Sequence, residues 1–244
     1  MWWLFVAQGD AILGIRRGNG DPHPALLKFG KKQDIERFAQ GVLYMNTLKR
    51  FVEMESESDP LRGDSREGVS LMLQADRTAL SIAVDGQFVP IGGIIGPIYY
   101  RQPDLLNVNV FCMHALREPG GASGIFVDPI NFAFGDTYAI VLDFDEFMRR
   151  LAARVPTGHL LQSGLVEYVD EASYHGSAGV FKKLSSFSYQ SEFRIALLPG
   201  TGAVLQLELG DLSDILILGP LPELNDRLSV QVISRPGRDV HARA

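Results

Sequence analysis

The chain has 244 residues, of which 46% are hydrophobic and 21% are charged, as expected for a folded globular protein with one large core or two small ones. Its formal net charge of -6 argues against a general polyanion-binding surface. A single cysteine, Cys112, excludes an intramolecular disulfide and a thiolate metal cluster. The cytoplasm is therefore the expected compartment.

The chain opens with an apolar run, MWWLF, that polar residues at positions 8 to 10 interrupt. It is too short and too broken to span a bilayer, so we expect no membrane partner. We expect Trp2, Trp3, Leu4 and Phe5 to pack on the domain or to mediate a homodimer, because such a patch seldom stays in water. Residues 1–24 are accordingly predicted to be an N-terminal extension.

The predicted domain covers residues 25–235, and residues 236–244 are predicted to be a C-terminal tail. A short strand over 26–29 precedes a helix over 31–41, whose apolar residues share one face and whose Gly41 suits the C-terminal cap. A strand and a short helix follow in 42–55, and the breaker-rich residues 55–68 predict a polar loop.

From Val69 onward, short apolar or alternating runs separated by Gly, Pro and Asp predict strands. These runs are 69–73, 79–84, 88–91, 108–115, 138–144, 165–169, 193–198, 203–209 and 215–218. One further helix is predicted from Asp145, with its apolar residues at helical spacing. The chain does not alternate regularly between strand and helix, so we predict a single α+β domain with a mixed or mainly antiparallel central sheet and a few helices.

Several common enzyme classes lack their motifs here, since the chain has no P-loop, no G-x-S-x-G and no H-E-x-x-H. The five histidines are scattered, so we expect no metal. Cys112 and His114 lie two residues apart on a predicted strand and should share a face. They are either a nucleophilic pair or, as is more common, a buried thiol beside a hydrogen-bonded histidine.

The strongest local pattern is FSYQSEFRIALLPG, residues 187–200. Its aromatic-x-x-Gln-x-Glu string, Phe187 to Gln190 to Glu192, resembles the motif of ADP-ribosyltransferases, in which an aromatic precedes a Gln/Glu-x-Glu pair at the start of a strand. In that family the second acid holds the nicotinamide ribose of NAD and stabilises the oxocarbenium-like transition state. The resemblance implies that Glu192 is catalytic, that Gln190 selects the acceptor and that NAD is the substrate.

Other positions of that family also have counterparts here. Its members carry an Arg or His on an early strand, where this chain has Lys28. They carry a Ser-x-Ser or an aromatic on a middle strand, where this chain offers His114 or Tyr138. If residues 190 and 192 are extended, their side chains point to one face and can address one cleft.

A broader resemblance covers most of residues 26–197. The order LLKFG, RGDSREG, FCMHA, TYAIVLDF and FKKLSSFSYQSEFRI is similar to an uncharacterised family of bacterial and phage-borne domains. It suggests a role in phage–host conflict and implies that eight polar residues meet in one cleft. These are Lys28, Arg62, Asp64, Glu67, His114, Lys182, Glu192 and Arg194.

Two interpretations of these residues remain open. One is an NAD-dependent ADP-ribosyltransferase or NAD-cleaving enzyme, a toxin or phage-defence effector whose acceptor is a protein or a nucleic acid. The other is a non-catalytic protein-interaction module, in which Arg62 and Asp64 pair on the surface and Arg194 simply pairs with Glu192.

Overall fold

The protein is described by a computed structural model that covers residues 3–7, 11–14, 25–56, 61, 63–116, 127–228 and 230–232. It is an α+β domain built around a mainly antiparallel sheet, as predicted. Its α-helices are α1 (Lys32–Ala39), α2 (Leu48–Ser56), α3 (Phe144–Ala152) and α4 (Leu224–Arg227). Short 3-10 helices are η1 (Ala75–Arg77), η2 (Pro103–Asn107), η3 (Pro129–Phe134), η4 (Ser185–Gln190) and η5 (Leu221–Glu223).

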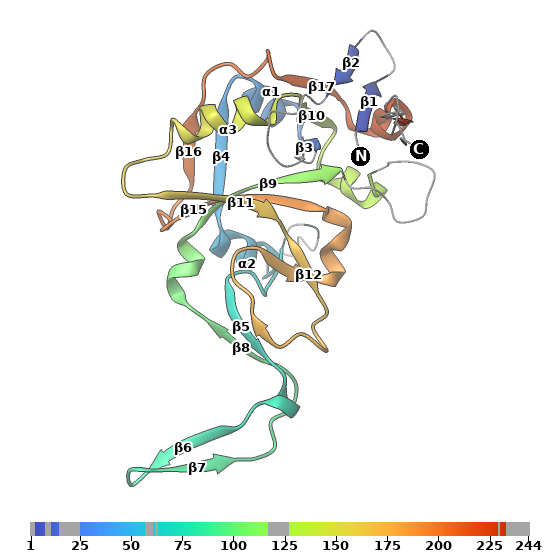
Figure 1. Cartoon of the computed structure of the whole chain (residues 1–244). Coiled ribbons are helices and arrows are strands. Elements are labelled where there is room, and N and C mark those ends of the chain that lie inside the picture. Colours follow the sequence, from blue (N-terminus) through green and yellow to red (C-terminus); the bar gives the residue numbers. More distant parts are fainter. Residues whose placement is uncertain are drawn as a thin grey trace, which may run out of the picture.

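The main sheet has the antiparallel order β11-β15-β9-β3-β10-β17 (Figure 1). Its strands are β3 (Ala25–Gly30), β9 (Asn109–Leu116), β10 (Thr137–Val141), β11 (Leu160–Leu165), β15 (Glu192–Leu198) and β17 (Leu216–Pro220). β4 (Val42–Thr47) also pairs with β9, and β16 (Leu205–Glu208) pairs with β4. β9 thus lies at the centre of the domain.

Smaller sheets surround the main one. β1 (Trp3–Ala7) lies between β2 (Ala11–Gly14) and β18 (Val230–Val232), so the predicted N-terminal extension contributes two strands. The predicted packing of its aromatic side chains lies outside what the structure describes. β12 (Glu167–Val169) and β14 (Lys182–Leu184) form a parallel pair.

The remaining strands form a long extension of the domain. β5 (Val69–Leu73) pairs with β8 (Ile98–Arg101) and with β13 (Gly176–Ser177). Beyond them, β6 (Leu80–Val84) and β7 (Gln87–Ile91) form a hairpin closed by Asp85 and Gly86, both at positive φ. Figure 1 shows this hairpin at the far tip of the extension, away from the main sheet.

Alternation along β9 and β15 explains why the core and the polar site lie on opposite faces of the sheet. Phe111 and Met113 of β9 join the largest apolar cluster together with Phe193 and Ile195 of β15. That cluster also contains the apolar faces of α1 and α3. The intervening residues of the two strands therefore point to the other face, where the polar residues gather.

The predicted elements agree with the observed ones, with differences at their ends. The strand predicted over 138–144 stops at Val141, because the Asp143 carboxylate accepts a hydrogen bond from the Glu146 N–H and caps α3. The strand predicted over 165–169 is divided between β11 and β12. In the described part of the chain, no helix has both the length and the apolarity needed to cross a membrane.

Candidate functional site

A cavity of about 550 Å³ opens where the main sheet divides along one edge of β9. β9 pairs with β4 at Asn109 and Val110 and with β3 from His114 onward, so residues 111–113 lie at the gap between these two partners. The Lys28 ammonium reaches into the gap and donates to the Cys112 carbonyl at 2.7 Å. A cavity of this volume suits a small organic ligand.

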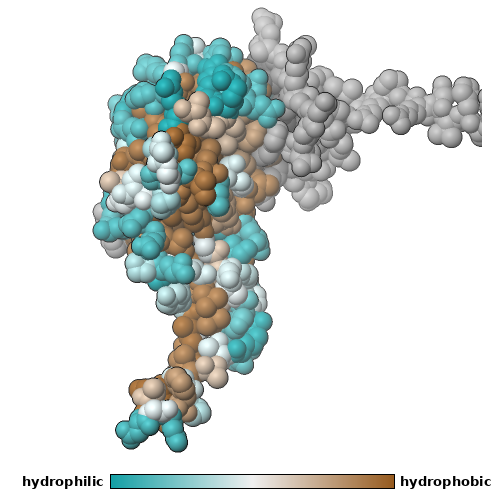
Figure 2. Space-filling model, turned by 60° about the vertical axis from the view of Figure 1, so that its left-hand side comes forward, coloured by the Kyte–Doolittle hydropathy of each residue, from teal (hydrophilic) through white to brown (hydrophobic). Residues whose placement is uncertain are grey.

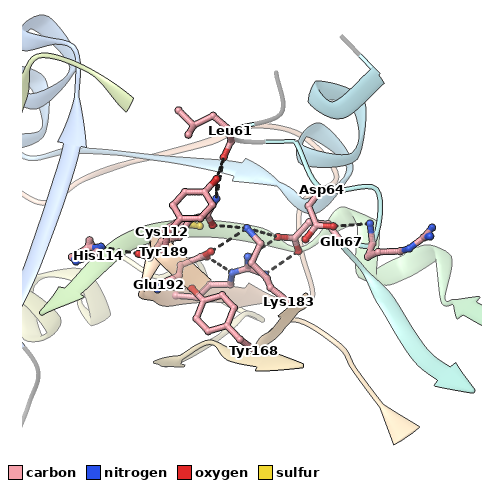
Figure 3. Close-up of polar contacts among 12 residues, drawn as sticks. Leu61, Asp64, Glu67, Cys112, His114, Tyr168, Lys183, Tyr189 and Glu192 are labelled. Atoms are coloured by element: carbon pink, nitrogen blue, oxygen red, sulfur yellow. Dashed lines mark hydrogen bonds and ion pairs between the residues drawn. The ribbon is translucent and has the colours of Figure 1, made fainter. Parts of the chain in front are cut away.

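The wall of the cavity includes a cluster of four buried charges, Glu67, Lys183, Glu192 and Arg194, hereafter the ion cluster (Figure 3). The Arg194 guanidinium donates to both oxygens of Glu67, at 2.7 and 3.0 Å, and its Nε donates to Glu192 at 2.7 Å. Lys183 Nζ lies 3.3 Å from Glu192 and 3.5 Å from Glu67. All four side chains are at most 5% exposed.

Electrostatics keep the Glu192 carboxylate ionised. Burial by itself raises its pKa, but Arg194 and Lys183 outweigh that effect, and the net shift is downward. Burial likewise opposes the charge on Lys183, yet the two glutamates raise its pKa. Because buried charges are costly unless paired, each member of the cluster depends on its partners.

The segment 61–68 brings Asp64 and Glu67 to the ion cluster. Asp64 is 2% exposed, and its carboxylate accepts a hydrogen bond from the Arg66 N–H at 2.8 Å. Gly68 has φ +69°, a conformation that suits glycine. Burial raises the Asp64 pKa to about 6, and the charge of Glu67 adds to the rise. This carboxyl group therefore titrates close to neutral pH.

Gln190 and Glu192 reach the cavity through a turn, and not along an extended segment as predicted. Gln190 ends the 3-10 helix η4, and Ser191 is left-handed with φ 42°, so the segment is not extended. Both Gln190 and Glu192 nevertheless line the cavity. Gln190 accepts a hydrogen bond from Lys183 at 2.8 Å, and the Glu192 N–H donates to the Tyr168 hydroxyl at 2.8 Å. The turn, and not strand alternation, directs Gln190 into the site.

Cys112 and His114 both line the cavity, as expected for residues two apart on a strand. Burial first, and then the Glu192 carboxylate, raise the Cys112 pKa to about 12, so this thiol stays protonated. His114 Nδ1 lies 2.8 Å from the Gln190 carbonyl, and its ring lies 5.3 Å from that of Phe29. The geometry favours a protonated, half-buried thiol and a positioned histidine over a nucleophilic pair.

Most of the predicted site residues that the structure describes lie at the cavity or against the ion cluster. Those on the cavity wall are Lys28, Glu67, His114, Gln190, Glu192 and Arg194, with Asp64 beside them. Arg62 lies outside the described residues.

Three predicted site residues lie elsewhere. Tyr138 points to the opposite side of β10 from Ala139, the register partner of Lys28, and packs in a separate apolar cluster beside Gly219. Lys182 is paired with Glu167 outside the cavity. Phe187 covers Lys183 Nζ, 4.8 Å from its ring centroid, and does not line the cavity. The structure therefore does not bring these three residues to the cavity wall.

Lys183 is the buried lysine that the sequence analysis did not select. Successive side chains on β14 point to opposite faces, and the register with β12 places Lys182 outward and Lys183 inward. The adjacent lysines are identical in the sequence, so only the knowledge that residues 182–184 form a strand beside Glu192 could have separated them. Tyr168 was missed as well, because its contact with Glu192 spans 24 residues.

The lining of the cavity combines charged and aromatic side chains. Lys31 and Arg37, at the two ends of α1, are exposed and line it together with the exposed Asp34, the buried Phe38 and the half-buried Phe134. Among the residues that the structure describes, no group of three or more His, Cys, Asp or Glu is placed to hold a metal ion. The arrangement can accommodate an anionic ligand with an aromatic ring, and it presents a carboxylate from its wall.

Comparisons of the chain with known families, curated proteins and solved structures gave no match. The two resemblances noted in the sequence therefore rest on their motifs alone. The function has to be argued from the cavity and the ion cluster.

Proposed function

We propose that the protein cleaves NAD, as an ADP-ribosyltransferase or an NAD glycohydrolase, with the nicotinamide ribose bound beside Glu192. The observation that carries this proposal is the ionised Glu192 carboxylate on the wall of a 550 Å³ cavity. Gln190, the acceptor-selecting residue of the motif, lies on the same wall.

The chemistry suits a fixed carboxylate. Breaking the bond between the nicotinamide nitrogen and ribose C1′ sends the bonding electrons to nicotinamide and leaves positive charge on the sugar. A carboxylate held nearby stabilises that charge, which exists mainly in the transition state. Water, or a nucleophilic group of a protein or nucleic acid, then bonds to C1′ and loses its proton.

Lys183 and Arg194 act as positioning residues in this proposal. They keep Glu192 ionised and hold its two oxygens, one at 2.7 Å from Arg194 Nε and the other at 3.3 Å from Lys183 Nζ. They also offset part of its negative charge. The carboxylate therefore attracts the developing cation less strongly than an unpaired one would, but its orientation is fixed. A carboxylate with fixed geometry needs no reorganisation when the sugar charge develops.

The lining of the cavity supports the choice of a dinucleotide. Lys31 and Arg37 can receive the pyrophosphate, and Phe134, which is half-buried, can contact a base ring. Lys28, on the early strand, can reach the same ligand from the β9 gap.

The test is release of nicotinamide from labelled NAD by the purified protein. Glu192→Gln keeps the side-chain shape and removes the charge, and we expect turnover to fall by about two to three orders of magnitude. Glu167→Gln makes the same change in the exposed pair with Lys182 and should leave turnover unchanged. Gln190→Ala should alter acceptor choice more than nicotinamide release.

Two outcomes contradict the proposal. Wild-type protein that releases no nicotinamide above background is not an NAD-cleaving enzyme. If Glu192→Gln has the wild-type circular dichroism and melting curve and also the wild-type turnover, Glu192 is not catalytic. Comparing the folding of each variant separates lost catalysis from a disrupted ion cluster.

A second candidate function, a protein-interaction module, is favoured by the β6–β7 hairpin. Its strands expose several large apolar side chains far from the cavity, among them Ile82, Val84 and Phe88. A domain that worked only through this surface would leave NAD intact. The nicotinamide assay therefore also discriminates between the two functions.

A further inference from the structure

The β6–β7 hairpin, hereafter the arm, is apolar and exposed along its whole length. Every residue of both strands is exposed. The register pairs Leu80 with Ile91 and Ile82 with Val89, so these four side chains share one face, together with Val84 and its uncharged partner Gln87. Their exposed fractions lie between 40% and 53%. Figure 2 shows apolar surface on the arm and on the part of the extension, β5 and β8, that joins it to the domain.

An isolated two-stranded hairpin is at best marginally stable in water, because it has no core of its own. Contiguous apolar surface of this kind usually marks an interaction site. Within the described part of the chain, the arm makes its main contacts between its own two strands, β6 and β7. A partner that covers the apolar face would supply the missing core.

We propose that this partner is a second copy of the chain, and that two arms pack apolar face on apolar face about a two-fold axis. In such a contact each surface meets its own equivalent, so any charge on it would face a like charge. Neither strand contains a charged residue, although the whole chain carries a net charge of -6. The arm projects from the domain (Figure 1), so its contact keeps the two acidic bodies apart.

Face packing, and not edge pairing, is the mode that the arm favours. Pro90 lies in β7 and has no N–H to donate, which blunts that edge against a further strand. Edge pairing would also leave the five apolar side chains in water. Packing the two faces together buries them, and this dimer does not depend on the proposed NAD chemistry.

The test is the mass of the full-length protein in solution, measured by light scattering and by sedimentation over a range of concentrations. We expect a dimer. A double variant, Ile82→Lys with Val89→Lys, should weaken it on the order of 100-fold or more, since two ammonium groups per copy would lack partners at the interface. Ala83→Lys with Phe88→Lys places the same two charges on the opposite face, where these residues are paired, and should leave the dimer intact.

Disulfide cross-linking gives a second readout, which does not require the folded arm to accept a lysine. Cys112 is the sole cysteine and its pKa is raised to about 12, so a cysteine placed on the exposed arm is the more reactive of the two. Under mild oxidation at least one of Leu80→Cys, Ile82→Cys and Val84→Cys should form a disulfide-linked dimer, whereas Ala83→Cys should not.

Three results overturn the proposal. The wild-type protein could be a monomer at every concentration, or the dimer could survive the double variant. The dimer could also be lost only when residues 1–20 are deleted, which would assign it to the N-terminal aromatic residues. In the first case the arm serves a different partner, and in the other two the copies associate elsewhere.

Discussion

Replacing Asp64 by Asn should make the protein more stable at neutral pH and leave its stability near pH 4 almost unchanged. Asp64 is 2% exposed and lies against the ion cluster. Burial, followed by the charge of Glu67, raises its pKa from 3.8 to about 6. Asn keeps the oxygen that accepts from the Arg66 N–H, so the substitution removes the titration and retains that contact.

The sign follows from proton uptake in the two states. Between pH 4 and pH 6 the carboxyl group is ionised in the unfolded chain but still holds its proton in the folded protein. The folded state therefore binds more protons, and stability falls as the pH rises through this window. A pKa rise from 3.8 to about 6 corresponds to a loss of about 3 kcal/mol once the pH exceeds 6.

The assay is urea unfolding of wild type and Asp64→Asn at each pH unit from 4 to 8. Acids far from Asp64 titrate alike in both proteins, so their contributions cancel in the difference, whereas the coupling of Asp64 to Glu67 is part of what the difference measures. That difference should grow from near zero at pH 4 to about 3 kcal/mol in favour of Asn above pH 6. Asp76→Asn, at a side chain that is 81% exposed, should show a flat difference. A flat difference for Asp64→Asn, or a less stable variant at pH 8, would refute the reasoning.

Two further predictions concern the same site. Glu67→Gln leaves Arg194 with half of its carboxylate partners and should lower the free energy of unfolding in urea by about 3–5 kcal/mol. Glu167→Gln, in the exposed pair with Lys182, should lower it by less than about 1 kcal/mol. Equal losses would show that burial does not decide how much stability is lost. Cys112, with its pKa raised to about 12, should resist thiol reagents at pH 7 in the folded protein and react at once in urea. Rapid labelling of the native protein would mean that the thiol is reachable and ionised.

Hydrophobic periodicity predicted most of the elements that build the site. β9 and β15 follow from runs in which alternate residues are apolar, and α1 follows from an apolar face that ends at Gly41. Gly41 has φ +96°, and a Cβ there would lie 2.0 Å from the Gly210 carbonyl oxygen, so this cap tolerates little but glycine. Local chemistry of this kind can be read without knowledge of the fold.

The cavity itself could not be predicted in the same way. It exists because β3 and β4 pair with different parts of β9, and that choice of register is a long-range property. Tyr138 was offered as an alternative to His114 from the family resemblance. The registers of β10 with β3 and of β3 with β9 place the two side chains on the same face of the sheet, but Tyr138 lies on the far side of β3 from β9 and packs in a separate apolar cluster. Lys182 and Lys183 differ only in which face of β14 they occupy.

The arm is a second feature that hydrophobic periodicity predicts only in part. Residues 80–84 and 87–91 have the alternation and apolarity of core strands, and they were correctly predicted to be strands. Periodicity reports which side chains share a face, but it does not report what covers that face. Here the covering element is absent from the described domain, and the strands lie in solvent.

Stability alone does not explain why the protein contains the ion cluster. A buried set of two acids and two bases gains little over apolar side chains of the same volume, because desolvation cancels most of the attraction. The same four residues are costly to disturb singly, since each removal leaves an unpaired charge. An apolar core lies on the opposite face of β9 and β15, so the fold can fill such positions with Phe, Met and Ile. Charges retained at the wall of an open cavity are better explained by what they hold in place. Lys183 and Arg194 contact both glutamates, and on Glu192 each cation lies against a different oxygen, so the pair fixes the orientation of that carboxylate.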